Sequence, residues 1–226
     1  LWYRRQRQMC IRDRKNISIF IIWLVHISGF MGILFYDLDF FAGFTYVNLL
    51  LMSIILFLNL KLESNYHILS ILSIFLIGMI TESLGVNYGL IFGDYEYGNN
   101  LGFKLFGVPY LIGVNWIILT AISANIASFL TKNRSVVLTI IIGTLLMLAM
   151  DFVMEPIAPK LDMWRFKNLI VPPSNYVGWL FVGLFTQTLY NLYFRQKEII
   201  VSTNLYLAFF FFFGCLNLNF MLLNGY

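Results

Sequence analysis

Carboxylate residues lie within or at the end of two strongly apolar segments of the sequence. Glu82 occurs in GMITESLGVNYG, and Asp151 occurs in MLAMDFVMEP, four residues before Glu155. An ionisable side chain inside a membrane span costs about 2.5–3.5 kcal/mol on insertion scales, so such a residue is by default a candidate functional residue. Burial also favours the neutral form of a carboxyl group, which can donate a proton. Glu82 and Asp151, with apolar sequence on both sides, are therefore the first candidates for a catalytic acid.

Neighbouring polar and aromatic residues indicate a larger site. Residues four positions apart lie on one face of a helix, so Glu155 can lie beside Asp151 if the helix continues that far, although Pro156 limits it. An amide and two aromatic side chains open a later apolar segment: Asn175, Tyr176 and Trp179. We expect all of these side chains at the same face of the membrane as Glu82.

Purely structural roles could also account for several of these residues. Tryptophan and tyrosine near helix ends commonly anchor a protein at the membrane interface, which could explain Tyr110, Trp164, Tyr176 and Trp179. Glu155 and Asp162 could form a solvated ion-pair network with nearby loop bases, namely Lys160, Arg165 and Lys167. His26 is expected to pack as a satisfied interior residue. With two cysteines in all, neither a disulfide framework nor a cysteine metal site is expected.

Apolar helices must position these residues, because the chain is unusually hydrophobic. Hydrophobic residues make up 60% of it and charged residues only 12%, with a mean hydropathy of +0.79, whereas soluble domains carry about 25% charged residues. A helix that crosses a bilayer needs about 20 mainly apolar residues. Seven segments fit that description: 17–36, 44–60, 68–86, 110–130, 136–154, 176–194 and 199–223. The predicted fold is all-α, a polytopic membrane protein with about seven transmembrane helices in one bundle, forming a single domain over residues 15–226.

Two connections between the predicted spans, 87–109 and 155–175, are long and differ from simple linkers. They are rich in glycine, proline, tyrosine, tryptophan and acidic residues. Long loops in a compact protein are usually functional or disordered, and their aromatic content argues against disorder. We therefore expect them to be ordered and to contribute to the site.

The short connections predict the orientation in the membrane. Five basic residues fall in connections after even-numbered spans: Lys61, Lys132, Arg134, Arg195 and Lys197. The positive-inside rule places those loops in the cytoplasm. The N-terminus is then cytoplasmic and the C-terminus external, in a membrane expected to be the bacterial inner membrane.

Residues 1–14, LWYRRQRQMCIRDR, carry five of the fifteen basic residues and one of the eleven acidic residues. The segment resembles translated sequencing-adapter sequence, and we expect it to be non-native; a genuine basic cytoplasmic tail is the alternative. Without it, ten basic and ten acidic residues remain. Net charge therefore gives no support for nucleic-acid binding.

Several motifs follow one another between about residues 75 and 185. The first three are Glu82-x-x-Gly85, Gly93-x-Tyr95-x-Tyr97 and Gly107-Val108-Pro109. The last is a series that runs Asp151, Pro156, Trp164, Pro172, Asn175, Tyr176, Gly178 and Trp179. Together they resemble the carotenoid biosynthesis protein family of carotenoid 1′,2′-hydratases, similar to bisanhydrobacterioruberin hydratase. Arg165-Phe166 departs from the family pattern, in which a second tryptophan often follows Trp164, and this bears on which carotenoid is used.

The resemblance implies an enzyme, a carbon–oxygen hydro-lyase, that adds water to the terminal double bond of an acyclic carotenoid. That reaction needs a proton donor, a stabilised tertiary carbocation and a water molecule, but no cofactor or metal. The implied catalytic residues are Glu82, Asp151, Glu155 and Asp94. The implied substrate-binding residues are Tyr95, Tyr97, Trp116, Trp164, Asn175, Tyr176 and Trp179. Aromatic faces can stabilise a desolvated cation by about 2 kcal/mol or more.

Other functions stay open at this stage. A carotenoid end-group cyclase also begins by protonating an alkene, and a non-enzymatic carotenoid or lipid carrier could use the same polar residues along a substrate path. A retinal photoreceptor is nearly excluded, because the last span, 199–223, lacks the lysine that a Schiff base needs. The expected partners are a carotenoid and the lipid bilayer, with other enzymes of carotenoid synthesis as candidates.

Overall fold

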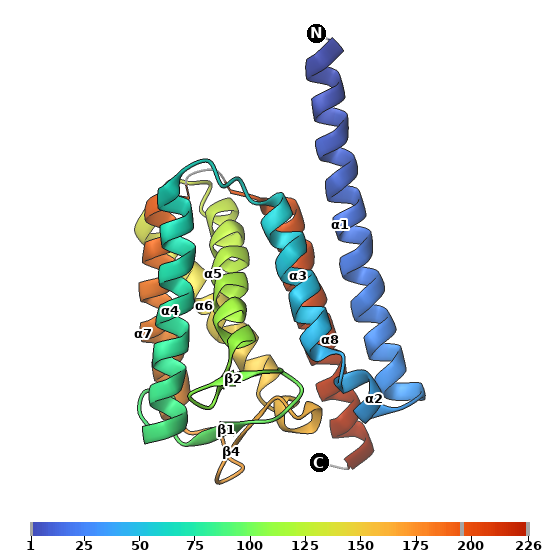
Figure 1. Cartoon of the computed structure of the whole chain (residues 1–226), viewed down its shortest axis with the longest axis vertical. Helices are drawn as coiled ribbons and strands as arrows, with labels where there is room; N and C mark the ends of the chain where they lie inside the picture. The colour runs from blue at the N-terminus through green and yellow to red at the C-terminus, as the bar shows by residue number, and fades with distance from the viewer. Residues whose placement is uncertain (1, 195–196, 225–226) are drawn as a thin grey trace.

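Seven long helices lie side by side in the computed structural model, which describes residues 2–194 and 197–224 (Figure 1). They are α1 (Trp2–Phe35), α3 (Thr45–Asn59), α4 (Asn65–Tyr88), α5 (Tyr110–Leu130), α6 (Val136–Met154), α7 (Pro173–Tyr193) and α8 (Ile199–Asn224). A short helix, α2 (Leu38–Ala42), precedes α3. The predicted all-α bundle is confirmed.

The outer surface of this bundle is apolar. Large side chains on different helices, such as Phe20, Leu76 and Phe181, are more than half exposed. Among the described residues, six stretches are long and apolar enough to cross a bilayer: Gln8–Phe35, Leu38–Asn59, Asn65–Tyr88, Tyr110–Leu130, Val136–Met154 and Ile199–Leu222. α7 has 21 residues but is less apolar, and it packs against α4, α5 and α6. The chain is therefore an integral membrane protein, whose helices satisfy the backbone hydrogen bonds that lipid cannot.

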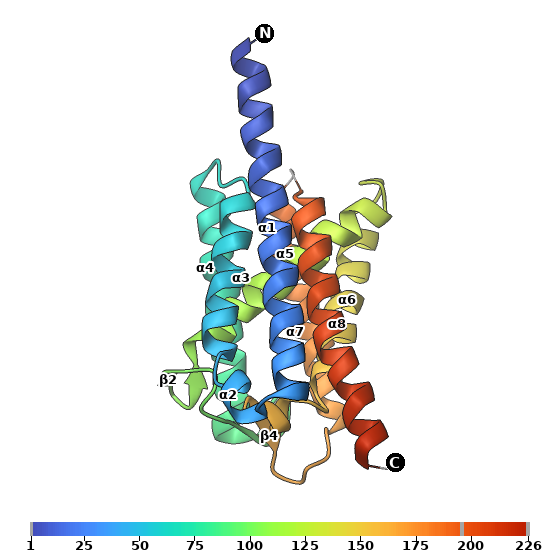
Figure 2. The ribbon, with the colours of Figure 1, turned by 90° about the vertical axis from the view of Figure 1, so that its right-hand side faces the viewer.

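Most predicted span boundaries lie close to the observed ones. The spans predicted at 110–130 and 136–154 coincide with α5 and α6. The helix at the first predicted span, 17–36, is longer than predicted, because residues 2–14 continue α1 beyond the end of the bundle (Figures 1 and 2). Leu1 and Arg195, which belong to predictions made above, lie outside the described residues. The non-native origin of residues 1–14 stays a prediction.

α5 is the central helix. Fifteen of its 21 residues are buried, and it packs against α3, α4, α6, α7 and α8. Small residues, among them Gly113, Ala121 and Ala124, let the surrounding helices approach its backbone closely. Side chains on α5 are therefore held in fixed positions relative to these five helices.

The two long loops join into a small sheet across one end of the bundle. β1 (Tyr95–Tyr97) pairs antiparallel with β4 (Trp164–Phe166), with Tyr97 opposite Trp164 (Figure 1). Since side chains alternate along a strand, both strands bury their outer residues toward the helices and expose their middle ones. A hairpin of β2 (Lys104–Leu105) and β3 (Val108–Pro109) and a 3₁₀ helix, η1 (Ala158–Leu161), complete this end.

Candidate active site

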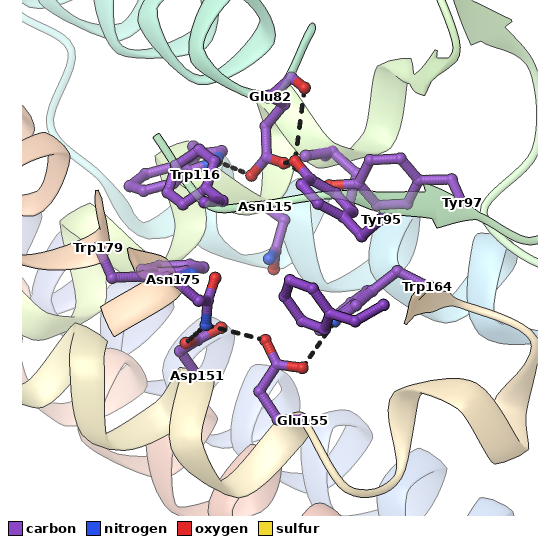
Figure 3. A pocket seen from close by; sticks show the side chains of 13 residues that line it. Glu82, Tyr95, Tyr97, Asn115, Trp116, Asp151, Glu155, Trp164, Asn175 and Trp179 are labelled. Atoms are coloured by element: carbon purple, nitrogen blue, oxygen red, sulfur yellow. Dashed lines mark hydrogen bonds between the residues drawn. The ribbon is translucent and has the colours of Figure 1, made fainter. Parts of the chain in front are cut away.

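Glu82 lies two turns before the end of α4, under the β1–β4 sheet, and is 5% exposed. Its Oε1 accepts a hydrogen bond of 2.8 Å from the indole N–H of Trp116 on α5. Its Oε2 accepts a hydrogen bond of 2.7 Å from the Tyr97 hydroxyl and a short one from the Tyr95 hydroxyl. Three donors from two elements therefore fix the orientation of this carboxylate (Figure 3).

Two glycines on α4 make these contacts possible. A Cβ added at Gly85 would lie 2.7 Å from the Tyr95 ring, and one added at Gly78 would lie 2.6 Å from the Trp116 ring. Both distances are shorter than side-chain carbons tolerate. Because the glycines lie about one turn to either side of Glu82, they let both rings approach the helix backbone beside it. The spacing Glu82-x-x-Gly85 thus has a steric reason.

Tyr95 and Tyr97 are held as neutral hydrogen-bond donors. Burial raises the pKa of both hydroxyls well above the usual value, and the nearby Glu82 carboxylate raises the pKa of each further. Neither phenol loses its proton at physiological pH. The pair therefore positions Glu82 rather than supplying protons.

A pair of carboxyl groups, those of Asp151 and Glu155, faces Glu82 across the site (Figure 3). Asp151 lies in the last turn of α6, and Glu155 follows with helical backbone angles, its N–H bonded to the Asp151 carbonyl at 3.0 Å. The Asn175 amide of α7 donates to Asp151 Oδ2 at 2.9 Å and to Glu155 Oε1 at 3.1 Å. The indole N–H of Trp164 donates to Glu155 Oε2 at 3.2 Å.

The two carboxyl groups lie close together, because one amide nitrogen, that of Asn175, donates to both. Burial raises the pKa of the Glu155 carboxyl to about 7, although the hydrogen bonds from Trp164, Asp151 and Asn175 act in the opposite direction. Two carboxylates at this separation repel each other when both are ionised, so a pair of this kind retains a proton to higher pH than a single exposed acid.

A small cavity of about 20 Å³ separates the two groups. That volume is about what one water molecule occupies, and a buried water also needs two to four polar partners. Carboxyl and amide groups provide them: Glu82, Asn115, Asp151, Glu155 and Asn175 line the cavity. The remaining wall is largely aromatic, and in it Trp116 and Trp179 stack with ring centroids 4.3 Å apart.

The structure brings nine of the eleven predicted site residues to this cavity: Glu82, Tyr95, Tyr97, Trp116, Asp151, Glu155, Trp164, Asn175 and Trp179. Asp94 and Tyr176 do not line it, which corrects their place in the predicted site. The Asp94 carboxylate forms an ion pair of 2.7 Å with Lys167, and both side chains are more than half exposed. Tyr176 lies against Phe152 on the outside of the bundle.

Nor do the loop bases form the predicted network with Glu155. Arg165 forms an ion pair of 2.7 Å with Glu96, opposite it in the sheet, and both point to solvent. Lys160 lies over the Phe220 ring at 4.1 Å. Asp162 accepts a hydrogen bond of 2.8 Å from the backbone N–H of Asn99. Glu155 is therefore an interior residue of the site, 5% exposed.

The sequence analysis missed four residues that also line the cavity: Phe92, Ile112, Asn115 and Phe166. Asn115 had a usable signal, because it is an amide inside an apolar span, directly before Trp116. In Figure 3 its side chain lies between the Glu82 group and the Asp151–Glu155 pair. Within the described part of the chain, no residue forms a hydrogen bond with this amide, which leaves it available to a bound molecule.

Comparisons with known proteins agree with this picture. The family model described as carotenoid biosynthesis protein matches residues 41–224, which include every residue of the cavity. A curated relative, the bisanhydrobacterioruberin hydratase of Haloarcula japonica, is 29% identical over 124 residues. That match covers 52% of this chain and 42% of the relative, so the chain spans less than half of the relative's length. No solved structure matches the chain.

Proposed function

This chain belongs to the carotenoid biosynthesis protein family, and we propose that it is a membrane hydratase that adds water to the terminal double bond of an acyclic carotenoid. The observation that carries the proposal is the cavity of about 20 Å³, which has room for one water between two groups of carboxyl side chains and beside a pair of stacked indoles. Proton donor, cation-stabilising surface and water site are the three requirements of alkene hydration.

The first step is proton transfer to the alkene. The Asp151–Glu155 pair is the donor, because it is buried and the pKa of Glu155 is raised to about 7. The proton forms a C–H bond at the less substituted alkene carbon, and the π electrons of the double bond supply that bond. A tertiary carbocation remains at the other carbon. The pair is left with one more negative charge, next to the cation it has created.

The second requirement is stabilisation of that cation. The faces of aromatic rings attract a desolvated cation, and the stacked Trp116 and Trp179 form one wall of the cavity. Glu82 adds a carboxylate on the opposite side from the donor pair, held by three hydrogen bonds. Fixed charges and dipoles that face the developing cation lower the barrier without reorganising during the reaction.

The third step is capture of the cation by water. The oxygen lone pair of the bound water forms the new C–O bond, and one of its protons returns to the Asp151–Glu155 pair. The amides of Asn115 and Asn175 are placed to orient the water. The product is a tertiary alcohol, and the Asp151–Glu155 pair has regained the proton that it gave to the alkene.

The principal alternative is a cyclase, which would protonate the same double bond but must then keep water from the cation. The polar lining of the cavity favours water addition over ring closure.

Expression of the chain in a bacterial host that makes lycopene tests the hydratase against the cyclase. Mass analysis of the pigments should show the gain of water. A product of unchanged mass with altered absorption would indicate a cyclase, and unchanged lycopene would indicate a carrier.

A further inference from the structure

A second and much larger cavity, of about 540 Å³, lies beside the active site. Most of its wall comes from α1, α2, α3 and α8, and the rest from α5, the end of α6 and the segments near η1 and β4. Pockets of about 300–1,000 Å³ are typical of sites that bind a small organic molecule. α1, α2, α3 and α8 contribute no residue to the carboxyl cluster, so most of the wall of this cavity lies outside the proton chemistry described above.

The two cavities meet at three residues. Ile112, Asn115 and Trp164 line both of them. Ile112 and Asn115 lie on successive turns of α5, and Trp164 comes from β4. A molecule in the larger cavity would therefore reach the carboxyl groups by passing between α5 and the sheet.

We propose that the larger cavity is a chamber for the uncharged acyclic chain of the carotenoid, which it seats with the terminal double bond between Asn115 and Trp164. This inference rests on the proposed function for the identity of the reacting group. The chamber wall, not the carboxyl cluster, then selects the length and shape of the substrate end.

The chemistry of the wall fits a hydrocarbon. No lysine, arginine, aspartate or glutamate lines the chamber, and six of its residues are phenylalanines: Phe40, Phe41, Phe44, Phe209, Phe212 and Phe213. The neutral polar side chains of His26, Asn48 and Asn115 interrupt this apolar lining. The hydroxyls of Ser28 and Thr45, which also line it, donate to the backbone carbonyls of Leu24 and Ala42 at 2.6 and 2.7 Å. An isoprenoid diphosphate would find no cation in this wall to bind its charge, whereas a polyene needs none.

α1 forms one side of the chamber, although the family match begins only at residue 41. Gly29 is the glycine of α1 that lines the chamber. The atom nearest to a Cβ added there lies in the Phe212 ring, 3.5 Å away, an ordinary van der Waals distance. A side chain at Gly29 can therefore extend into the chamber without displacing the backbone.

Gly29→Ala and Gly29→Leu test the chamber in the full-length protein, purified in detergent, with lycopene as the probe. Binding is measured by the quenching of tryptophan emission, which does not depend on turnover. Affinity for lycopene should fall by up to about tenfold for alanine and by more for leucine, the scale on which an apolar pocket rejects extra carbon atoms. Gly214→Leu is the matched control, since a Cβ at Gly214 on α8 also has room, 4.0 Å from Val153, but the residue lines neither cavity.

Affinity of Gly29→Leu equal to that of the unmodified protein would overturn the chamber. Loss of a co-purifying phospholipid from this variant, with lycopene affinity unchanged, would overturn it in favour of a lipid site. If the leucine variant does not accumulate, Gly29→Ala decides by the same comparison. An unmodified protein that binds lycopene but adds no water would contradict the hydratase and leave the chamber standing. Water addition by Gly29→Leu with an unchanged KM would contradict the chamber and leave the hydratase standing.

Discussion

At the residue scale, the site contains three carboxyl groups in two arrangements, Glu82 alone and Asp151 paired with Glu155. Glu82 is held by three neutral donors, whereas Asp151 and Glu155 face each other and share one amide, Asn175. Apolar sequence on both sides of Glu82 and Asp151 pointed to these two carboxyl groups as candidates, and both are buried beside the same cavity. The spacing of four residues placed Glu155 beside Asp151, but its burial could not be predicted, because nearby bases in the sequence offered it partners that the fold directs elsewhere. Asp94 was misplaced for the opposite reason, since its neighbours in the motif face inward while it faces solvent.

Replacing each interior acid by its amide should stop proton transfer and preserve the fold. Asp151→Asn and Glu155→Gln should each lower turnover by about 10²–10⁴-fold, the usual contribution of general acid catalysis. Glu82→Gln should lower it as well, because an amide carries no charge to stabilise the cation. Turnover of lycopene per folded molecule is the measurement. Asp94→Asn is the matched control and should retain full activity, since Asp94 lies outside the cavity. Normal turnover in both Asp151→Asn and Glu155→Gln would remove the pair from the mechanism.

The pH dependence follows from the raised pKa of Glu155. The pair donates a proton only while it retains one, and burial moves the pKa of Glu155 upward to about 7. Activity should therefore be highest below pH 7 and decline as the pH rises through about 7. An ordinary exposed glutamate would already have lost its proton near pH 4.3. A rate profile in detergent or nanodiscs checks this, and activity that is flat from pH 6 to about 9 would be incompatible with a carboxyl donor.

At the element scale, the helices could be predicted and the sheet could not. Apolar length alone predicts α5 and α6 to the residue, because a span is a local property of the sequence. β1 and β4 are three residues each, and Glu96 pairs with Arg165 across a separation of 69 residues. Strands so short have no periodic pattern to detect. Their in–out alternation nevertheless brings Tyr95, Tyr97 and Trp164 to the carboxyl groups, so the sheet determines much of the site.

Gly85→Ala tests the packing of this sheet against α4. The added methyl would lie 2.7 Å from the Tyr95 ring, which must then move away from Glu82. Overpacking of this kind typically costs about 1–3 kcal/mol of stability, so both the midpoint of thermal unfolding and the turnover should fall. Gly214→Ala, at a position with space, should leave both unchanged. Unaltered turnover in Gly85→Ala would mean that the contact between Tyr95 and Glu82 does not support catalysis.

At the scale of the whole molecule, the bundle carries its chemistry at one end, beneath the sheet, and a large apolar chamber beside it. The two connections that form the sheet and the short connections at 61–64 and 131–135 lie at opposite ends of the helices (Figure 1). In the proposed function, a carotenoid dissolved in the bilayer would enter the chamber from within the membrane and react at its end near one membrane surface.

The orientation predicted from charge can be tested directly. An epitope tag at residues 131–135, between α5 and α6, should be reached only from the cytoplasm, because that loop carries Lys132 and Arg134. A tag at residues 98–100, between β1 and β2, should be reached only from outside. Protease protection in sealed vesicles of both orientations is the measurement. Tags that are accessible from the same side would overturn the predicted topology.

The origin of the oxygen in the product tests the central claim most directly. Purified protein is given lycopene in water labelled with a heavy oxygen isotope, and the pigments are analysed by mass spectrometry. The hydratase predicts a product heavier than lycopene by one labelled water for each end that has reacted, and no such product from Asp151→Asn. A product of unchanged mass, or an alcohol whose oxygen does not come from the labelled water, would contradict it.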